Sequence, residues 1–187
     1  MTDTKKEKKK IRTIDLVYIA LGAVLIAVCS WISIPTTVPF TLQTFAIFFV
    51  LSALGGKRGT VSIVLYVLLG AVGVPVFAQF NSGIGVLLGS TGGYIVGFLF
   101  IGLIHWITVH FLGKKLWVEI LSLAVGLAVC YAFGTIWFTI VYAQENGAIG
   151  FVSAFTMCVI PFIIPDAIKL ALALTLARRL SPVLKLR

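Results

Sequence analysis

Long apolar stretches follow one another along almost the whole of this 187-residue chain. A run of about 20 apolar residues is long enough for a helix to cross the hydrocarbon core of a membrane. Hydrophobic residues make up 60% of the sequence and charged residues only 11%, too small a polar share to cover a water-soluble domain. The sequence therefore predicts an all-α integral membrane protein.

We expect six transmembrane helices, of which the second is short. They are predicted at about Leu16–Ile34, Leu42–Leu54, Val61–Phe77, Gly85–Phe111, Leu116–Tyr142 and Phe151–Ala177. Turn-rich connectors separate them: IPTTVP, GGKRG, QFNSG, GKK and QENGAIG. The predicted organisation is a basic N-terminal tail (1–13), a six-helix domain (14–180) and a C-terminal tail (181–187).

Basic residues occur in alternate connectors. Every Lys and Arg except Lys169 lies at one of the two ends of the chain (up to Arg12, or from Arg178 onward), in the second-to-third loop or in the fourth-to-fifth loop. The positive-inside rule then places both termini in the cytoplasm. Because topology and contacts with anionic lipid headgroups account for the net charge of +9, we do not expect nucleic-acid binding.

Lys169 lies in the sixth apolar stretch, three residues after Asp166. At this spacing the two side chains share a helix face and can pair. Each charge costs roughly 2.5–3.5 kcal/mol to place in hydrocarbon, which favours a polar site inside the bundle over a purely structural ion pair. Pro161 and Pro165 support this interpretation, because each leaves a backbone carbonyl without its helical partner.

A glycine-rich segment, GIGVLLGSTGGYIVGF, opens the fourth stretch at Gly83–Phe98. Glycines every four residues permit close helix packing, but the hydroxyls of Ser90, Thr91 and Tyr94 also suit a ligand that approaches the backbone. Both interpretations stay open. GGKRGT does not have the spacing of a phosphate-binding loop, so no ATP site is predicted.

Uncharged polar and aromatic residues gather near the predicted outer side of the membrane, opposite the basic connectors. Together with Asp166 and Lys169 they could line a pocket for a neutral or mildly anionic heterocycle; they are Thr41, Gln43, Phe77, Gln79 and Asn81. In the first stretch, small residues at Ala20, Ala23 and Ala27 predict a surface for close contact with another helix, in this chain or in a partner.

Catalytic and metal-binding patterns are not found. The cysteines (Cys29, Cys130, Cys158) share no metal-ligand spacing. The histidines (His105, His110) could be ligands, but their place near the end of a span favours interfacial or packed residues, and no acid–base constellation is present. We therefore predict neither an enzyme nor a metal or cofactor site.

Four motifs in order resemble those of the BioY family, the biotin-specific substrate-binding (S) components of energy-coupling-factor (ECF) transporters. The motifs are VPFTLQTF (Val38–Phe45), GGKRGTVSIVLYVLLGAVGVPVF (Gly55–Phe77), GIGVLLGSTGGYIVGF and PDAIKLALA (Pro165–Ala173). One departure is that Ser90 replaces the proline of the family's G-P-T-G-G-Y.

The resemblance implies a six-helix S component in the plasma membrane of a prokaryote, which binds biotin tightly on the outer side. Its implied partners are a transmembrane T protein and two ATPase subunits, which use the ATP. The implied substrate-binding residues are Gln43, Phe77, Asn81, Gly92, Gly93, Tyr94, Asp166 and Lys169, and the first-helix partner surface comprises Ala20, Ala23 and Ala27.

In the expected mechanism the loop at Ser33–Thr41 closes over the substrate, which is not altered chemically. The partner subunits then reorient the protein toward the cytoplasm. Two alternatives remain: an S component for another vitamin such as riboflavin or thiamine, and a self-sufficient small carrier, although the paired broken helices typical of carriers are not evident.

Overall fold

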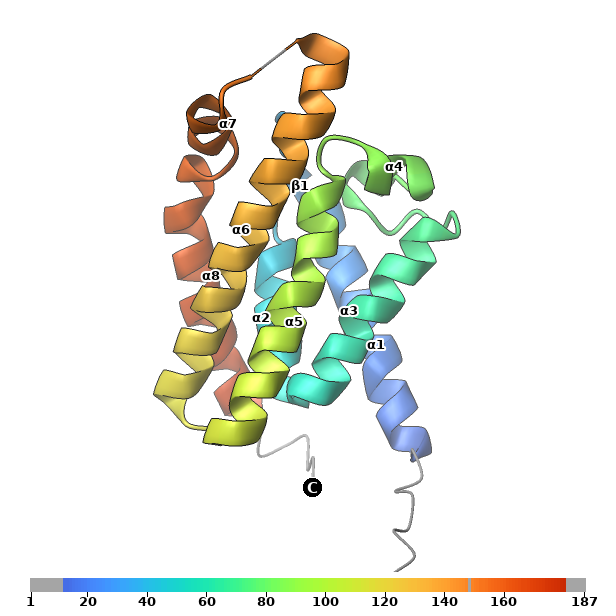
Figure 1. Cartoon of the computed structure of the whole chain (residues 1–187). Helices are drawn as coiled ribbons and strands as arrows, with labels where there is room; N and C mark the ends of the chain where they lie inside the picture. The colour runs from blue at the N-terminus through green and yellow to red at the C-terminus, as the bar shows by residue number, and fades with distance from the viewer. Residues whose placement is uncertain (1–11, 148, 181–187) are drawn as a thin grey trace, which may run out of the picture.

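Figure 1 shows a bundle of long helices with short elements gathered at one end and both ends of the described chain at the other. The computed structural model describes residues 12–147 and 149–180. Most of the predicted N-terminal tail (residues 1–11) and all of the C-terminal tail (181–187) lie outside the described residues.

Long helices form the body of the bundle. They are α1 (Thr13–Trp31), α2 (Gln43–Leu54), α3 (Gly56–Ala71), α5 (Gly92–Leu112), α6 (Leu116–Asn146) and α8 (Ile160–Leu180). The short elements are an antiparallel hairpin of β1 (Ser33–Ile34) and β2 (Phe40–Thr41), the 3₁₀ turn η1 (Ala78–Phe80), α4 (Ile84–Leu88) and α7 (Phe151–Cys158).

Four segments are long and apolar enough to cross a membrane: α1, α5, α6 over Leu116–Gln144, and α7 with α8 over Phe151–Leu180. The apolar helix α2 has 12 residues and α3 has 16. At about 1.5 Å per residue, α2 spans only about 18 Å of a hydrocarbon core about 30 Å thick. The predicted count of six membrane spans therefore stays a prediction.

The boundaries of the third predicted helix were wrong by about one and a half turns. The GGKRG motif is not a loop, because Gly55 alone makes the turn (φ 85°) and α3 begins at Gly56. A side chain at Gly59 would lie 2.8 Å from the Leu51 backbone, so this glycine permits close packing of α3 on α2. At the other end α3 stops at Ala71, and the chain folds back so that the Phe77 ring covers Gly70.

The fourth and sixth predicted helices are each broken into two. The glycine-rich segment forms the short helix α4, and Gly89 to Thr91 separate it from α5. The last apolar stretch breaks at Val159, between α7 and α8. Pro161 lies at the start of α8, where a missing N–H costs little, whereas Pro165 is inside the helix.

Glycines allow the helices to pack closely around the core. The most extensive contact is between α5 and α6, where side chains added at Gly93 and Gly97 would meet Trp137 and Cys130. The other main contacts join α2 with α8, α1 with α3, and α3 with α5. On the outer faces many large apolar side chains are exposed, for example Leu21 and Val24, as expected for surfaces that meet lipid.

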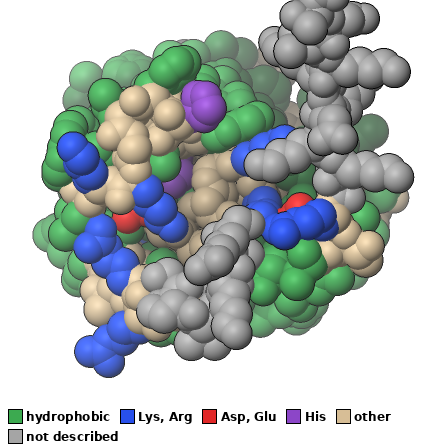
Figure 2. Space-filling model, turned by 90° about the horizontal axis from the view of Figure 1, so that it is seen from below, with side chains coloured by type: hydrophobic (Ala, Val, Ile, Leu, Met, Phe, Trp, Pro, Cys, Tyr) green, Lys and Arg blue, Asp and Glu red, His purple; other side chains and the backbone are tan. Residues whose placement is uncertain are grey.

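Basic side chains collect at the end of the bundle that carries the described termini. Figure 2 views this end and shows Lys and Arg side chains across it, with acidic side chains among them. The loops and helix ends there supply Lys57, Arg58, Lys114, Lys115, Arg178 and Arg179.

Candidate functional site

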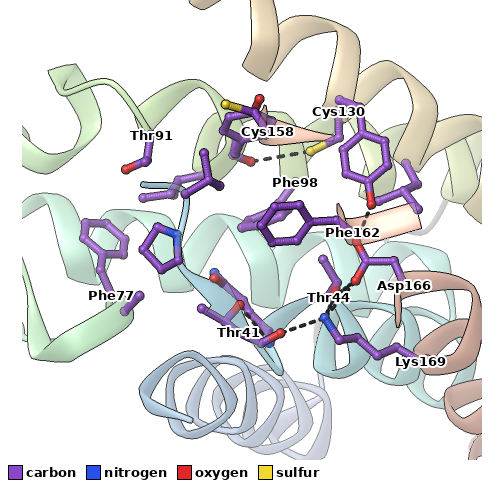
Figure 3. Close-up of a pocket in the computed structure, with 18 of the residues that line it drawn as sticks. Thr41, Thr44, Phe77, Thr91, Phe98, Cys130, Cys158, Phe162, Asp166 and Lys169 are labelled. Carbon is purple, nitrogen blue, oxygen red and sulfur yellow. Dashed lines mark hydrogen bonds and ion pairs between the residues drawn. The ribbon is translucent and has the colours of Figure 1, made fainter. Parts of the chain in front are cut away.

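A cavity of about 110 Å³ lies among the helices toward the opposite end, beneath the β1–β2 hairpin. Segments far apart in the sequence build it: the hairpin, the start of α2, the loop after α3, and residues of α5, α6 and α8. Figure 3 shows the side chains that point toward it. Its lining combines aromatic and aliphatic walls with a small number of polar groups, which is the usual composition of a small-molecule site.

Asp166 and Lys169 form an ion pair at the base of this cavity. They lie one turn apart on α8, with Lys169 Nζ 2.8 Å from Asp166 Oδ1. Asp166 is 1% exposed and Lys169 6%, so both charges are shielded from lipid by the surrounding helices. The predicted pairing and the predicted interior position are both observed.

Two side chains from other helices complete the partners of Asp166. Thr44 at the start of α2 donates its hydroxyl to Oδ1 at 2.8 Å, and the Tyr131 hydroxyl on α6 donates to Oδ2. These contacts join α2, α6 and α8 at one point.

Lys169 donates in three directions. Its ammonium bonds to the Thr41 backbone carbonyl at 2.7 Å, to Asp166 Oδ1 at 2.8 Å and to Thr44 Oγ1 at 3.2 Å. An ammonium group has three N–H donors, so all of them have partners. Lys169 also lies 4.4 Å from the centre of the Phe40 ring, close enough for a cation–π interaction.

The carboxylate keeps one position for a further donor. A carboxylate offers about four lone-pair positions, and Asp166 uses three of them for Thr44, Tyr131 and Lys169. A ligand could thus donate to Asp166 directly. To accept from Lys169, a ligand would have to replace one of its present partners, of which the Thr41 carbonyl belongs to the hairpin.

Aromatic rings form the other walls. Phe77 is buried beside Tyr66, with ring centroids 5.6 Å apart in an edge-on arrangement. Gln43 donates from its side-chain amide to the Tyr66 hydroxyl at 2.8 Å, which fixes the glutamine at the cavity edge. Tyr94 also lines the cavity, and its hydroxyl lies 3.1 Å from Thr135 Oγ1.

A strained turn carries Asn81 to the cavity. Gln79 and Phe80 both have positive φ, 58° and 59°, a conformation that costs a residue other than glycine about 1 kcal/mol or more. The Phe80 ring stacks on Trp31 at 5.0 Å, and Trp31 donates to the Pro75 carbonyl. These contacts with α1 hold the turn in place.

Six of the eight predicted substrate-binding residues line the cavity: Gln43, Phe77, Asn81, Tyr94, Asp166 and Lys169. Gly92 and Gly93 do not. A side chain at Gly92 would clash with the Leu87 carbonyl, and one at Gly93 with Trp137. These glycines therefore have a packing role in the structure, and they place the neighbouring Tyr94 on the cavity wall. That the lining residues bind a substrate stays a prediction.

The predicted partner surface on α1 divides between two faces. Ala23 and Ala27 are buried, 2% and 5% exposed, against the chain's own helices. Ala20 lies on the exposed face of α1. The small-residue stripe thus serves packing within the chain, and of the three alanines Ala20 is the one that the folded chain leaves accessible.

Sequence reasoning missed Thr44 and Tyr131 as members of the site. Thr44 directly follows Gln43 in the motif VPFTLQTF and lies three residues after Thr41. Tyr131 carried a weaker signal: a tyrosine in the middle of an apolar helix needs a partner for its hydroxyl, but the sequence does not say which.

Comparison with known proteins identifies the family and supports the fold. The BioY family model matches residues 4–186. The biotin transporter BioY of Thermotoga maritima is 39% identical over 170 residues, covering 89% of this chain and 95% of that protein. The probable biotin transporter BioY of Pyrococcus horikoshii is 40% identical over 173 residues, covering 92% and 98%.

A solved structure has the same fold. It is the crystal structure of the S-component for biotin from an ECF-type ABC transporter, with a TM-score of 0.79, 26% identity, and coverage of 96% of this chain and 94% of that chain. The matched proteins are transporters, in agreement with the prediction that the chain is not an enzyme, and its apolar helices make it a multi-pass membrane protein. This chain belongs to the BioY family.

Proposed function

We propose that this protein is the high-affinity biotin-binding S component of an ECF-type vitamin uptake transporter. The observation that carries the proposal is the shielded Asp166–Lys169 pair at the base of a cavity with aromatic walls, in a chain whose relatives are named biotin transporters. A buried charge pair costs free energy in a membrane protein. Recognition of a polar ligand explains why this chain has one.

The ureido ring of biotin suits this pair. It has two N–H donors and one carbonyl acceptor, so one N–H can bond to the remaining acceptor position of Asp166. The ureido carbonyl can accept from Lys169 if it takes the place of the Thr41 carbonyl, 2.7 Å from Nζ. Phe77 and Tyr94 would flank the fused rings, and Asn81 and Gln43 would add hydrogen bonds at the edge.

The hairpin acts as the cover of the site in this proposal. Val38, Pro39 and Thr41 line the cavity from above, and Lys169 bonds to the hairpin backbone at Thr41. Replacing that bond by a bond to the substrate removes one contact between the hairpin and α8, while the Phe40 ring still stacks on Phe162 of α8. Substrate entry and hairpin position are thereby linked through one ammonium group.

The transport cycle needs partners outside this chain. We propose six membrane spans with both termini in the cytoplasm of a prokaryotic cell, in the plasma membrane. A T protein and two ATPase subunits would reorient the biotin-loaded protein toward the cytoplasm. Partners can shift the protein from one orientation to the other only if they bind one orientation more tightly. The T protein would contact the exposed face of α1 that includes Ala20 and Val24.

The proposal is tested with purified wild-type protein. Isothermal titration with biotin, riboflavin and thiamine, together with mass spectrometry of any ligand retained through purification, identifies the vitamin. We expect tight 1:1 binding of biotin and no binding of the other two. A folded protein that binds riboflavin or thiamine and not biotin would assign the same architecture to another vitamin, and accumulation of biotin by the chain alone in vesicles would favour a self-sufficient carrier.

A further inference from the structure

A second cavity, of about 240 Å³, lies at the end of the bundle that carries the described termini. Helix ends surround it: Ser52 in the last turn of α2, Lys114 in the α5–α6 loop, Glu119 in the first turn of α6, and Ala177 and Arg178 in the last turn of α8. It is separate from the proposed biotin site, since the two cavities have no lining residue in common.

Two buried polar atoms of this lining lack hydrogen-bond partners among the described residues. They are Ser52 Oγ and Glu119 Oε1, on side chains that are 3% and 2% exposed. A buried polar atom without a partner costs about 1–3 kcal/mol. Because both residues line the cavity, one group placed there could bond to both.

The charges around Ser52 Oγ and Glu119 Oε1 indicate which chemical group the cavity could bind. Lys114 Nζ lies 4.0 Å and Arg178 Nη2 3.4 Å from the Glu119 carboxylate. Lys114 also donates to the Ser52 carbonyl at 2.7 Å, which uses one of its three N–H donors. One acid among two bases gives the lining a net charge of +1, so it favours an anion that also has a hydrogen-bond donor for Glu119.

We propose that this cavity binds a phosphoglycerol group, as in the headgroup of an anionic phospholipid. The phosphate would lie near Lys114 and Arg178, while a glycerol hydroxyl would donate to Glu119 Oε1 and a second would bond to Ser52 Oγ. Helix ends with Lys and Arg side chains lie at the depth of lipid headgroups. A bound lipid would join the ends of α2, α6 and α8, the helices that meet at Asp166 in the other half of the molecule.

The experiment uses the full chain in nanodiscs of phosphatidylglycerol, phosphatidylethanolamine or phosphatidylcholine, followed by native mass spectrometry and thermal melting. We expect one phosphatidylglycerol molecule to remain bound and to raise the melting temperature relative to phosphatidylcholine. Soluble glycerol phosphate, added to protein in phosphatidylcholine nanodiscs, tests whether the cavity binds a phosphoglycerol group that is not part of a lipid. Stabilisation by that compound but not by the lipid would contradict a lipid ligand.

Matched variants locate the site. Ser52→Ala should lower retention of phosphatidylglycerol by about threefold to tenfold, the effect of losing one neutral hydrogen bond. Lys114→Gln should lower it about tenfold, the effect of losing roughly one charge-assisted hydrogen bond. Lys115→Gln removes the same charge from the next residue, which does not line the cavity, and should retain the lipid. Biotin affinity of folded Ser52→Ala protein should be unchanged. Equal retention of all three lipids by the wild type, or equal loss in the Lys114 and Lys115 variants, would overturn the proposal.

Discussion

Lys169 donates to the backbone carbonyl of Thr41, 2.7 Å from its ammonium nitrogen, and so ties α8 to the second strand of the hairpin. Phe40, the neighbouring residue of that strand, lies over the same ammonium and stacks on Phe162 of α8 with centroids 5.7 Å apart. One side chain of α8 thus contacts both the proposed substrate position and the segment that covers it.

Replacing Phe40 should weaken the cover. Phe40→Leu keeps an apolar side chain but removes the ring that faces Lys169 and Phe162; cation–π and aromatic pairs are each worth about 0.5–1.5 kcal/mol. We expect biotin to dissociate about threefold to tenfold faster, measured by stopped-flow displacement of labelled biotin. Phe45→Leu is the control, because Phe45 stacks on Phe49 of its own helix α2, whereas Phe40 stacks on Phe162 of α8. Equal acceleration in both variants would contradict the role of Phe40.

Tyr131 should contribute to binding although it is distant in sequence from the other site residues. Tyr131→Phe removes the hydroxyl that donates to Asp166 Oδ2 and leaves a buried carboxylate oxygen short of a partner. A hydrogen bond to a charged group contributes about 1.5–3 kcal/mol, so biotin affinity should fall by at least about tenfold in isothermal titration. Tyr142→Phe, on the same helix but outside the cavity lining, should bind as the wild type does, and a Tyr131→Phe protein that does the same would contradict this prediction.

Substitutions of Asp166 and Lys169 should have non-additive effects on the stability of the protein. Lys169→Met alone leaves the Asp166 charge without its ammonium partner, and breaking a buried pair in this way costs about 3–5 kcal/mol. Adding Asp166→Asn removes the unpaired charge, so the double variant should melt at a higher temperature than Lys169→Met. The comparison uses melting curves in detergent without biotin. A double variant that is destabilised by the sum of the two single effects would show that the charges do not interact.

The two faces of α1 should respond differently to added bulk. Ala23 is 2% exposed, so Ala23→Leu should overpack the core and lower stability by about 1–3 kcal/mol. Ala20→Leu should leave stability and biotin binding unchanged but reduce co-purification with the T protein. Ala132→Leu, at an exposed position of α6, is the matched control for partner binding; loss of the T protein in that variant as well would remove the argument for the α1 face.

Much of this architecture could be predicted from the sequence because apolar length and charge placement determine it. The Asp166–Lys169 pair was found because two charges in hydrocarbon have few explanations. The breaks at Gly89–Thr91 and Val159 were not predicted, since hydropathy does not distinguish a continuous helix from two short ones. Tyr131 was missed for another reason: its contact with Asp166 joins residues 35 positions apart, and a single sequence contains no record of that contact.

Biotin titration of three variants beside the wild type tests whether the Asp166–Lys169 pair recognises biotin. The variants are Asp166→Asn, Lys169→Ala, and Asp166→Asn combined with Lys169→Met, each checked for folding by size-exclusion chromatography and melting. We expect tight 1:1 binding to the wild type and loss of affinity by at least about a hundredfold in every folded variant, as expected when a charged hydrogen-bonding group that contacts the ligand is removed. Biotin binding of wild-type strength in the folded double variant would contradict this expectation, and would leave the ion pair with a structural role alone.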